Sequence, residues 1–393
     1  MQSDTITTPT ARAQSGRYIF IASPWTAMGG GMFRVGEYLL QAQKSEVPPE
    51  AAELRALETR GAAGTLFSFW VLTTALVQIV RGRVSGQLVG VHVNMAERLS
   101  IVRKGAVIVL SRAMGIPVVL HLHAAELHHS YPRMPKLLQA MTRWIFSLPA
   151  SCVVLGTAAQ QFVVRELRVP PSRVEIVFNG VPGPTVPRRL VKENAVRRLL
   201  FVGNLSERKG VTDLLKALSR PGFEDLPLEL VFAGDGDIAG YQVKANALGL
   251  EKKVRFSGWV GQAEVADLMA QADLLVLPSY DEGLPLVILE ALGNGVAVVC
   301  TPVGEIPSVL QHGVTACLVE PGDVNSLAAS LQSLLRQPDL LRALEKNGKA
   351  LYEQEFSLSQ FFFNIAQIHK RSFGVSGQSA QYFSPTKKSY PDL

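Results

Sequence analysis

Short apolar runs alternate with longer stretches of mixed polarity through most of the 393-residue chain. In the first half, the apolar runs predict strands at Tyr18–Ala22, Leu88–Val93, Pro117–Leu122 and Cys152–Leu155. The stretches between them predict helices at Met32–Gln43, Glu97–Met114 and Pro135–Phe146. Because strands and helices take turns along the chain, we expect a parallel sheet whose strands are joined by crossover helices.

The same alternation starts again in the second half of the chain. The predicted strands are Arg198–Val202, Leu228–Ala233, Val254–Ser257, Leu274–Leu277 and Ala297–Thr301. The predicted helices are Val211–Leu218, Gly240–Leu248, Gln262–Ala270, Pro285–Leu292 and Val324–Leu335. Between the halves, "NGVPGPTVPRR" at residues 179–189 is rich in Gly and Pro, which is typical of a linker. The pattern therefore predicts two βα domains joined by a hinge.

The predicted boundaries divide the chain into six parts. They are a disordered leader over 1–16, a first domain over 17–182, a linker over 183–197, a second domain over 198–357, a helix over 358–371 and a mobile tail over 372–393. The leader holds Ser, Thr and Ala but no apolar segment, so it is not typical of a secretory signal.

Residues 62–80, "AAGTLFSFWVLTTALVQIV", form an uncharged segment that ends at Arg81 and Arg83. Its length would allow it to cross a bilayer. Its Thr and Ser residues dilute the hydrophobicity, however, and a strand-like run follows within a few residues. We therefore expect a helix that is mostly buried or that touches a membrane surface.

Charge is shared unevenly between the halves. Residues 1–198 hold 23 Lys and Arg against 11 Asp and Glu, although the net charge of the whole chain is only +6. A basic half suits an anionic membrane surface or a phosphate-bearing acceptor, and a solvated basic surface without a partner is the open alternative. The three cysteines are widely spaced, which fits neither a disulfide framework nor a metal cluster, so we expect a reducing, cytoplasmic setting.

Candidate chemistry gathers at "EGLPLVILE", where Glu282 and Glu290 stand on either side of a Gly-Leu-Pro corner that follows a predicted strand. Pro285 suits the first turn of a helix, whose start leaves backbone N–H groups unpaired near Gly283 and Leu284. Such a helix start binds anions, and a diphosphate is the obvious ligand. Carboxylates beside it can accept hydrogen bonds from ribose and sugar hydroxyls. The segment therefore predicts a nucleotide-sugar site. The alternative is one acid near a helix dipole and one facing solvent, which leaves the corner unexplained.

With its neighbours, this segment resembles the signature of a known enzyme family. The matching stretches are "DLLVLPS", "EGLPLVILEAL", "GNGVAVVCTPVGEIPSVL", "LLFVGNLSERKGVTDLLKAL" (199–218), "LVFAGDGD" (230–237), "VRFSGWV" (254–260), "GVTACLVEPGD" (313–323) and "IVFNGV" (176–181). Over most of the chain this set is similar to the retaining glycosyltransferases of family 4, also called glycosyl transferases group 1. The resemblance implies an α/β fold of the GT-B type, with two Rossmann-like βαβ domains facing a central cleft.

The resemblance implies a division of labour between the domains. The first domain would bind the acceptor and the second the nucleotide-sugar donor, and the last helix, Leu358–Ile368, would cross back to the first domain. Glu282 matches the glutamate that lies against the transferred sugar, and Glu290 matches the one that holds the ribose. Lys209 matches the lysine that neutralises the leaving diphosphate.

Two matches depart from the family pattern. Asn204 follows Gly203 where the family commonly has an arginine, so Arg208 is the candidate for the second positive charge. His123 matches the histidine that contacts the donor sugar, but Ala124 stands where the family has glycine. The catalytic candidates are His123, Lys209 and Glu282. The donor-binding candidates are Gly30, Gly31, Gly203, Asn204, Arg208, Lys209, Trp259, Glu282, Gly283, Leu284, Pro285, Leu286 and Glu290.

The glycines at 29–31 lie between a predicted strand and a helix, where backbone N–H groups can approach a phosphate or an acceptor. A flexible turn is the alternative. Glu126 would serve either in acceptor binding or as a helix cap.

We expect no metal and no cofactor. Asp235-Gly236-Asp237 resembles the Asp-x-Asp metal motif of another glycosyltransferase fold, but it directly follows a strand, where Gly and Asp serve a tight turn. His121 and His123 lie on one face of a strand, yet a third ligand is missing, and His121, His128 and His129 are expected to be structural or surface residues.

The sequence therefore predicts a retaining glycosyltransferase that moves a hexose from a UDP- or GDP-linked sugar. We expect a lipid-linked saccharide acceptor in bacterial exopolysaccharide or envelope glycan synthesis, a peripheral position on the inner face of the cytoplasmic membrane, and no nucleic-acid partner. The alternatives are a soluble small-molecule acceptor, an epimerase or phosphorylase on the same fold, and a catalytically silent partner that binds a nucleotide sugar.

Overall fold

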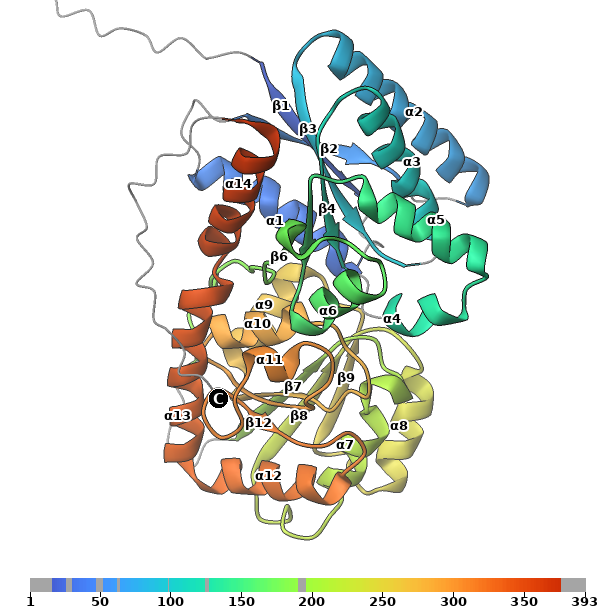
Figure 1. Cartoon of the computed structure of the whole chain (residues 1–393). Coiled ribbons are helices and arrows are strands. Elements are labelled where there is room, and N and C mark those ends of the chain that lie inside the picture. The colour runs from blue at the N-terminus through green and yellow to red at the C-terminus, as the bar shows by residue number, and fades with distance from the viewer. Residues whose placement is uncertain are drawn as a thin grey trace, which may run out of the picture.

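The computed structural model describes residues 16–25, 30–46, 52–61, 64–97, 99–123, 127–189 and 196–375. Its described residues form two parallel β-sheets with helices on their faces, one sheet above the other in Figure 1. The expected leader up to residue 15, linker residues 190–195 and the expected tail from residue 376 lie outside the described residues.

The first sheet has six parallel strands in the order β2-β1-β3-β4-β5-β6. The strands are β1 Tyr18–Ser23, β2 Glu53–Glu58, β3 Leu88–Met95, β4 Val118–Leu122, β5 Ser151–Val154 and β6 Val174–Ile176. The helices between them are α1 Gly30–Glu46, α2 Thr65–Val84, α3 Leu99–Ala113, α4 Leu127–Ser130, α5 Lys136–Ser147 and α6 Thr157–Arg165.

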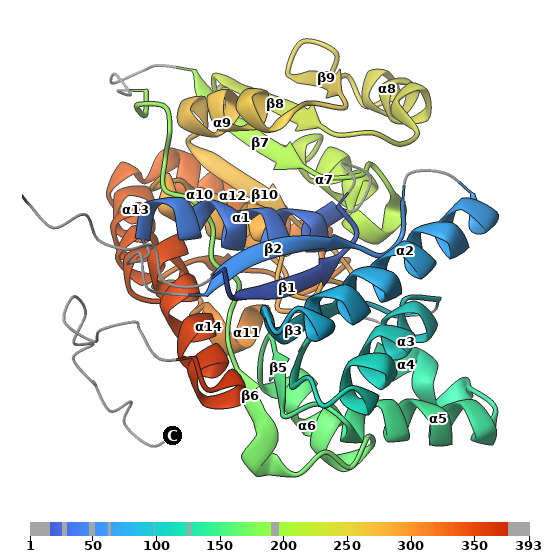
Figure 2. The same ribbon diagram turned by 90° about the horizontal axis from the view of Figure 1, so that it is seen from above.

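This sheet is buried on both faces, as its apolar strands require. In β1, Phe20 and Ala22 pack in one core with residues of α2 and α3, whereas Ile19 and Ile21 pack in another with residues of α1. Side chains alternate between the faces of a strand, so a continuous apolar run supplies both cores. Figure 2 shows α2, α3 and α5 on one side of the sheet and α1 on the other.

The second sheet has six parallel strands in the order β12-β11-β10-β7-β8-β9. The strands are β7 Arg197–Val202, β8 Leu228–Ala233, β9 Val254–Gly258, β10 Leu274–Leu277, β11 Ala297–Cys300 and β12 Cys317–Leu318. The helices are α7 Val211–Leu218, α8 Ile238–Ala247, α9 Gln262–Gln271, α10 Leu286–Gly293, α11 Ile306–Val309, α12 Val324–Arg336 and α13 Pro338–Leu351. The strand order reverses between β7 and β10, and such a switch point leaves a crevice at the carboxyl ends of the strands.

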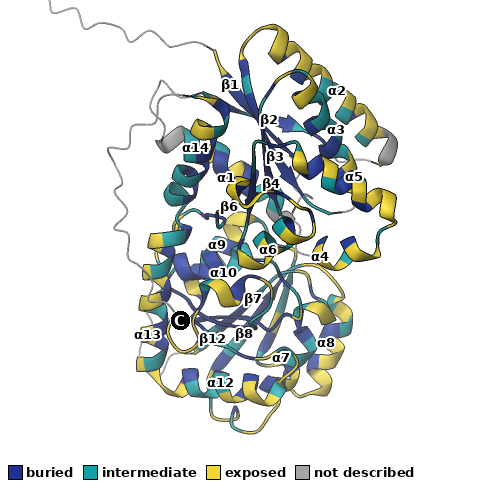
Figure 3. Cartoon of the chain, viewed as in Figure 1, coloured by how far each residue is buried: buried dark blue, intermediate teal, exposed yellow. Residues whose placement is uncertain are grey.

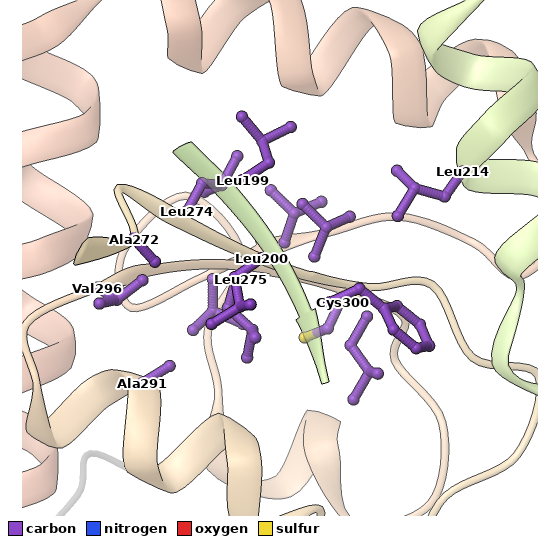
Figure 4. Close-up of a cluster of buried hydrophobic side chains, with 14 of the residues drawn as sticks. Leu199, Leu200, Leu214, Ala272, Leu274, Leu275, Ala291, Val296 and Cys300 are labelled. Carbon is purple, nitrogen blue, oxygen red and sulfur yellow. The ribbon is translucent and has the colours of Figure 1, made fainter. Parts of the chain in front are cut away.

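The core of the second sheet forms where β7 and β10 lie side by side. Figure 4 shows Leu199 and Leu200 of β7 beside Leu274 and Leu275 of β10, with Ala291 of α10 packed nearby. All five side chains are buried. This packing sets the positions of β10 and α10, and therefore of the loop between them.

The last helix, α14 Leu358–Phe373, returns to the first sheet and packs on α1, β3 and β4. Ser357 caps it by accepting a hydrogen bond from Gln360 N. Its apolar face contributes Phe361, Phe362 and Ile365 to the core that contains α1. A π-helical turn at Tyr352–Phe356 (η5) joins α13 to this helix.

All nine strands predicted from the sequence are present, each within two residues of its predicted ends. The prediction missed three strands. β2 mixes polar and apolar residues and forms no apolar run, because it lies at the sheet edge and buries only Leu54 and Leu57. The other two, β6 and β12, are too short to stand out as apolar runs.

The uncharged segment 62–80 folds mainly as α2, but the expectation that it is mostly buried is wrong. Val71, Ala75 and Ile79, spaced four apart, are buried, and Ala75 and Ile79 pack in one core with strands of the first sheet. On the outer face, Phe69 and Trp70 are 72% and 61% exposed. No helix in the described part of the chain has both the length and the apolar character that a membrane crossing needs. Contact with a membrane surface stays a prediction.

Candidate active site

Lys209 and Glu282 meet at the carboxyl edge of the second sheet. Lys209 belongs to the short 3-10 turn Glu207–Lys209 (η4) after β7, and Glu282 lies in the loop after β10. Because β7 and β10 adjoin at the switch point, the loops that follow them border one crevice. Lys209 Nζ pairs with Glu282 Oε1, and Ser279 Oγ donates to the same oxygen at 2.8 Å. Both charged side chains are largely buried, which strengthens their interaction.

Gly210 allows the loop that carries Lys209 to pack closely against the chain after β10. It has φ +70°, and a Cβ atom would lie 2.0 Å from the carbonyl oxygen of Pro278. Only glycine avoids both the backbone strain and the clash. Tyr280 N donates to the Arg208 carbonyl oxygen at 2.8 Å and joins the two loops further. The glycine of "RKG" therefore places the lysine beside Glu282.

The start of α10 presents unpaired backbone N–H groups, as the sequence predicted. Within the described residues, the N–H groups of Gly283, Leu284 and Leu286 donate no hydrogen bond, and Pro285 supplies no side-chain cap. Helix starts with free N–H groups favour anions, because the amide donors and the helix dipole act together.

Glu290, on the second turn of α10, reaches across to α1 of the first domain. Its Oε1 accepts hydrogen bonds from Arg34 Nη1 at 3.3 Å and Tyr38 OH at 3.2 Å. Burial raises the pKa of Glu290, and Arg34 opposes that rise. Burial and the neighbouring Glu290 raise the pKa of the Tyr38 hydroxyl. The alternative that Glu290 faces solvent is therefore wrong. Its Oε2 has no hydrogen-bond partner among the described residues.

A cavity of about 570 Å³ lies between the two domains. Its lining includes His123, Ala158 and Ala159 of the first domain and Glu282, Gly283 and Glu305 of the second. These residues follow β4, β5, β10 and β11, so the carboxyl ends of both sheets border the cavity. His123 and Glu282, predicted from the sequence to act together, line the same space.

A chain of buried imidazoles stands behind His123. His92 belongs to β3. Its Nδ1 lies 2.8 Å from Nε2 of His369, and its Nε2 lies 3.3 Å from Nδ1 of His121. The ring of His121 lies 4.0 Å from that of His123, whose Nε2 is 3.2 Å from Asn94 Oδ1. Burial lowers the pKa of His123 to about 3, so this ring is neutral at physiological pH and has one nitrogen able to accept a hydrogen bond.

The remaining donor candidates do not line this cavity. Gly30 and Gly31 begin α1, while Gly29, Ala124 and Glu126 lie outside the described residues. Gly203 directly follows β7, and Asn204 is exposed beside it. Arg208 Nη1 donates to the Asp281 carbonyl oxygen at 2.7 Å. Trp259 is 73% exposed after β9. Their predicted roles toward a donor stay predictions.

Asp235 and Asp237 serve the turn that the sequence predicted. Asp235 Oδ1 accepts a hydrogen bond from Gly236 N at 2.8 Å, and Asp237 Oδ1 caps α8 by accepting one from Gly240 N at 3.0 Å. Among the residues that the structure describes, no group of three or more His, Cys, Asp or Glu side chains is placed to hold a metal ion.

Sequence reasoning missed several residues of the site. Arg34 and Tyr38 lie on a correctly predicted helix, α1. Helical periodicity shows which residues share a face of the helix, but it does not show which residues elsewhere in the chain that face contacts. Glu305 was seen only as part of a matching stretch. His128 and His129, expected to be structural or surface residues, are exposed but line the cavity.

Comparison with known proteins agrees with this geometry. The sequence profile of a family described as "Glycosyl transferases group 1" matches residues 185–351. A putative teichuronic acid biosynthesis glycosyltransferase of Bacillus subtilis is 30% identical over 274 residues, which cover 64% of this chain and 67% of that protein. A D-inositol 3-phosphate glycosyltransferase of Thermobispora bispora is 32% identical over 242 residues, or 56% of each chain.

The fold has solved counterparts. The structure of Anabaena HepE in complex with UDP and glucose superposes with a TM-score of 0.68, at 17% sequence identity, over 90% of this chain and all of that one. At this identity the likeness shows the fold alone. It confirms the expected GT-B arrangement of two Rossmann-like domains.

Proposed function

Because the chain belongs to the glycosyl transferases group 1 family, we propose that it moves a hexose from a UDP- or GDP-linked sugar to an acceptor, with retention of configuration and without a metal ion. The observation that carries this proposal is the Lys209–Glu282 pair at the sheet switch point, in which Glu282 lines a cavity together with His123. The complexes with UDP and UDP-glucose described for structural neighbours support a nucleotide-sugar donor.

The diphosphate of the donor binds at the start of α10 in this proposal. Cleavage of a sugar–phosphate bond builds negative charge on the diphosphate, and fixed cations and amides must offset it. Lys209 and the free N–H groups of Gly283 and Leu284 supply this charge compensation. In the free protein Lys209 is paired with Glu282, so the diphosphate competes with the carboxylate for the ammonium group. Glu282 is then released to accept hydrogen bonds from the sugar hydroxyls.

The ribose reaches Glu290 through the oxygen that the protein leaves unused. Oε1 is held by Arg34 and Tyr38 of α1, and Oε2 is available to a ribose hydroxyl. His123 accepts a hydrogen bond from the donor sugar through its unprotonated ring nitrogen, since Nε2 faces the Asn94 amide oxygen. Both domains therefore take part in donor binding.

Retention follows from transfer on one face of the sugar. The leaving phosphate helps to deprotonate the acceptor hydroxyl as the new bond forms, and the hydroxyl attacks from the side that the phosphate leaves. In this proposal Glu282 accepts hydrogen bonds from the sugar hydroxyls. Glu305 is held by a backbone amide of α6. We therefore assign neither carboxylate as a nucleophile. Detection of a covalent glycosyl–enzyme adduct would overturn this part of the proposal.

The acceptor is lipid-linked, and the first domain rests on an anionic membrane surface in this proposal. Helices α2, α3 and α5 lie side by side, and Figure 3 shows exposed residues along them. These exposed residues include large apolar side chains and the basic residues Arg81, Arg83, Arg112 and Lys136. The exposed apolar side chains are Phe67, Phe69, Trp70, Val77, Val80, Val84, Leu99, Val102, Leu137, Leu138 and Trp144. Apolar residues interleaved with Arg and Lys are typical of helices that lie in a membrane interface.

The test is donor hydrolysis across a panel of UDP-, GDP- and ADP-sugars in EDTA. The wild-type chain should bind one donor and hydrolyse it slowly. Lys209→Ala and Glu282→Gln should lower the rate by about 100-fold or more, the usual effect of removing a group that stabilises developing charge. Lys216→Ala and Glu320→Gln, which alter exposed residues of the same domain, serve as matched controls. If no nucleotide sugar binds, the site assignment is wrong. If one binds without turnover, the chain is a silent binding partner.

A further inference from the structure

The side chain of Glu305 crosses from the second domain to the first. Glu305 lies in the loop between β11 and α11, and it is buried. Its Oε1 accepts a hydrogen bond from Ala159 N at 2.9 Å, and its Oε2 accepts one from Ala158 N at 3.4 Å. These amides belong to the first turn of α6 in the first domain.

Helix α6 has no cap from its own segment. The residue before it is Gly156, which has no side chain, so the first N–H groups of the helix would be unpaired without Glu305. A Cβ atom on Gly156 would lie 2.1 Å from Oε2 of Glu305. The glycine therefore leaves the space that the carboxylate occupies. A negative charge is also favoured at this end of a helix.

The segment that carries Glu305 also holds the backbone of Glu282. Glu305 N donates to the Gly283 carbonyl oxygen at 3.0 Å. Gly304 has φ +59°, and a Cβ atom on it would lie 2.0 Å from the Glu282 carbonyl oxygen. Residues 303–305 are thus packed directly against Glu282 and Gly283, and Glu305 extends from them to the other domain.

We propose that Glu305 is a positioning residue that couples closure of the two domains to the placement of Glu282. The inference rests on the proposed function, because transfer requires both domains to meet around the donor. When the cleft opens, the hydrogen bonds between the Glu305 carboxylate and the first turn of α6 break. When it closes, their contact fixes residues 303–305 and, through them, the Glu282 backbone. Loss of Glu305 therefore affects turnover more than it affects binding of the donor to the second domain.

Hydrogen exchange of the full chain tests the contact without any substrate. In Glu305→Ala the amides of Ala158 and Ala159 should exchange about tenfold faster than in the wild type, because their acceptor is gone. Small-angle X-ray scattering should show a larger radius of gyration for the same variant. Glu320→Ala removes an exposed glutamate of the same domain and should change neither measurement.

Kinetics test the coupling, with whichever of UDP-glucose, GDP-mannose or ADP-glucose the wild type hydrolyses. Glu305→Ala should lower kcat about tenfold while the Kd of that donor stays within about twofold. Glu305→Gln keeps an oxygen acceptor but loses the charge. Its kcat should therefore lie between that of the wild type and that of Glu305→Ala. A residue that only supports the fold would lower the melting temperature and weaken donor binding together.

A double-mutant cycle tests whether the two domains meet through this contact. Gly156→Ala places a methyl group against the carboxylate and should reproduce the loss in kcat. Since both changes break one contact, Gly156→Ala/Glu305→Ala should be no worse than the poorer single variant. Additive losses would overturn the proposal.

Two other results also overturn it: unchanged exchange at Ala158 and Ala159 in Glu305→Ala, and faster exchange with unchanged kcat. If the wild type turns over no nucleotide sugar, the proposed function fails instead. Exchange and scattering then still decide whether Glu305 holds the domains together.

Discussion

The buried imidazoles behind His123 make the stability of the fold depend on pH. Burial lowers the pKa of His92 to about 4 and that of His123 to about 3, against an ordinary value of 6.5. Below pH 6.5 the unfolded chain takes up protons that the folded chain refuses, so stability falls as the pH falls. Between pH 6.5 and about pH 5, each of these two histidines should cost about 2 kcal/mol of stability.

Urea unfolding from about pH 7.5 to pH 5 measures this effect. His92→Gln should flatten the slope of the unfolding free energy against pH by about one proton. His129→Gln changes an exposed histidine and should leave the slope as it is in the wild type. A slope that is equal in the wild type and His92→Gln would show that His92 does not stay neutral in the folded chain.

At the residue scale, sequence reasoning succeeded where chemistry and spacing coincide. Glu282 and Lys209 were each assigned to the donor site through a resemblance, with separate roles, and the structure places them in contact. Tyr38 was not predicted, because a tyrosine in an apolar helix carries no sign of the carboxylate that it meets. His121 was predicted to be a structural or a surface residue, and the structure buries it fully between His92 and His123.

At the element scale, the turn between β7 and α7 depends on Gly210. An alanine in a left-handed conformation lowers the free energy of unfolding by about 1–2 kcal/mol. Gly210→Ala should lower it by more, because the new methyl group also clashes with the Pro278 carbonyl oxygen. It should also lower turnover, since the clash displaces Lys209 from Glu282. Gly249→Ala is the matched control, because Gly249 has φ +71° and open space around its Cα.

Equilibrium unfolding and donor hydrolysis of both variants check this prediction. The difference between the two free energies of unfolding isolates the clash from the backbone strain. Equal losses of stability in Gly210→Ala and Gly249→Ala would contradict the close packing of the two loops.

Strands were predicted best where they form an uninterrupted apolar run in the sequence. The central strands are buried on both faces and read as continuous apolar runs, so their ends were found within two residues. The edge strand β2 and the short helix α6 were missed, because each draws its stability from packing against other elements. The outer face of α2 was misjudged, since an uncharged segment gives no sign of which side meets the sheet.

At the scale of the whole molecule, the α2, α3 and α5 face should bind vesicles rich in phosphatidylglycerol. Phe69→Ser/Trp70→Ser removes the two most exposed aromatic side chains of α2. Sedimentation of the protein with such vesicles should fall about tenfold or more, because the variant lacks the apolar surface that these side chains would bury in the membrane interface. High salt should also weaken binding, because basic residues share this face. Phosphatidylcholine vesicles should bind less.

The control for vesicle binding lies on the other domain. Val243→Ser alters a side chain of α8 that is 68% exposed, so it removes apolar surface without touching the proposed membrane face. Equal binding of both variants would assign the exposed apolar residues of the first domain to another role and favour a soluble acceptor.

The sequence by itself determined the two βα units, the order of their central elements and the two carboxylates, Glu282 and Glu290, around a helix start. These features are local, since strand burial, helix starts and glycine turns each depend on a few neighbouring residues. Only the tertiary structure decided that Glu290 is held by α1 and that Glu305 caps α6. Such contacts join residues far apart in the chain, and they depend on how two separately built domains come together, which no local pattern encodes.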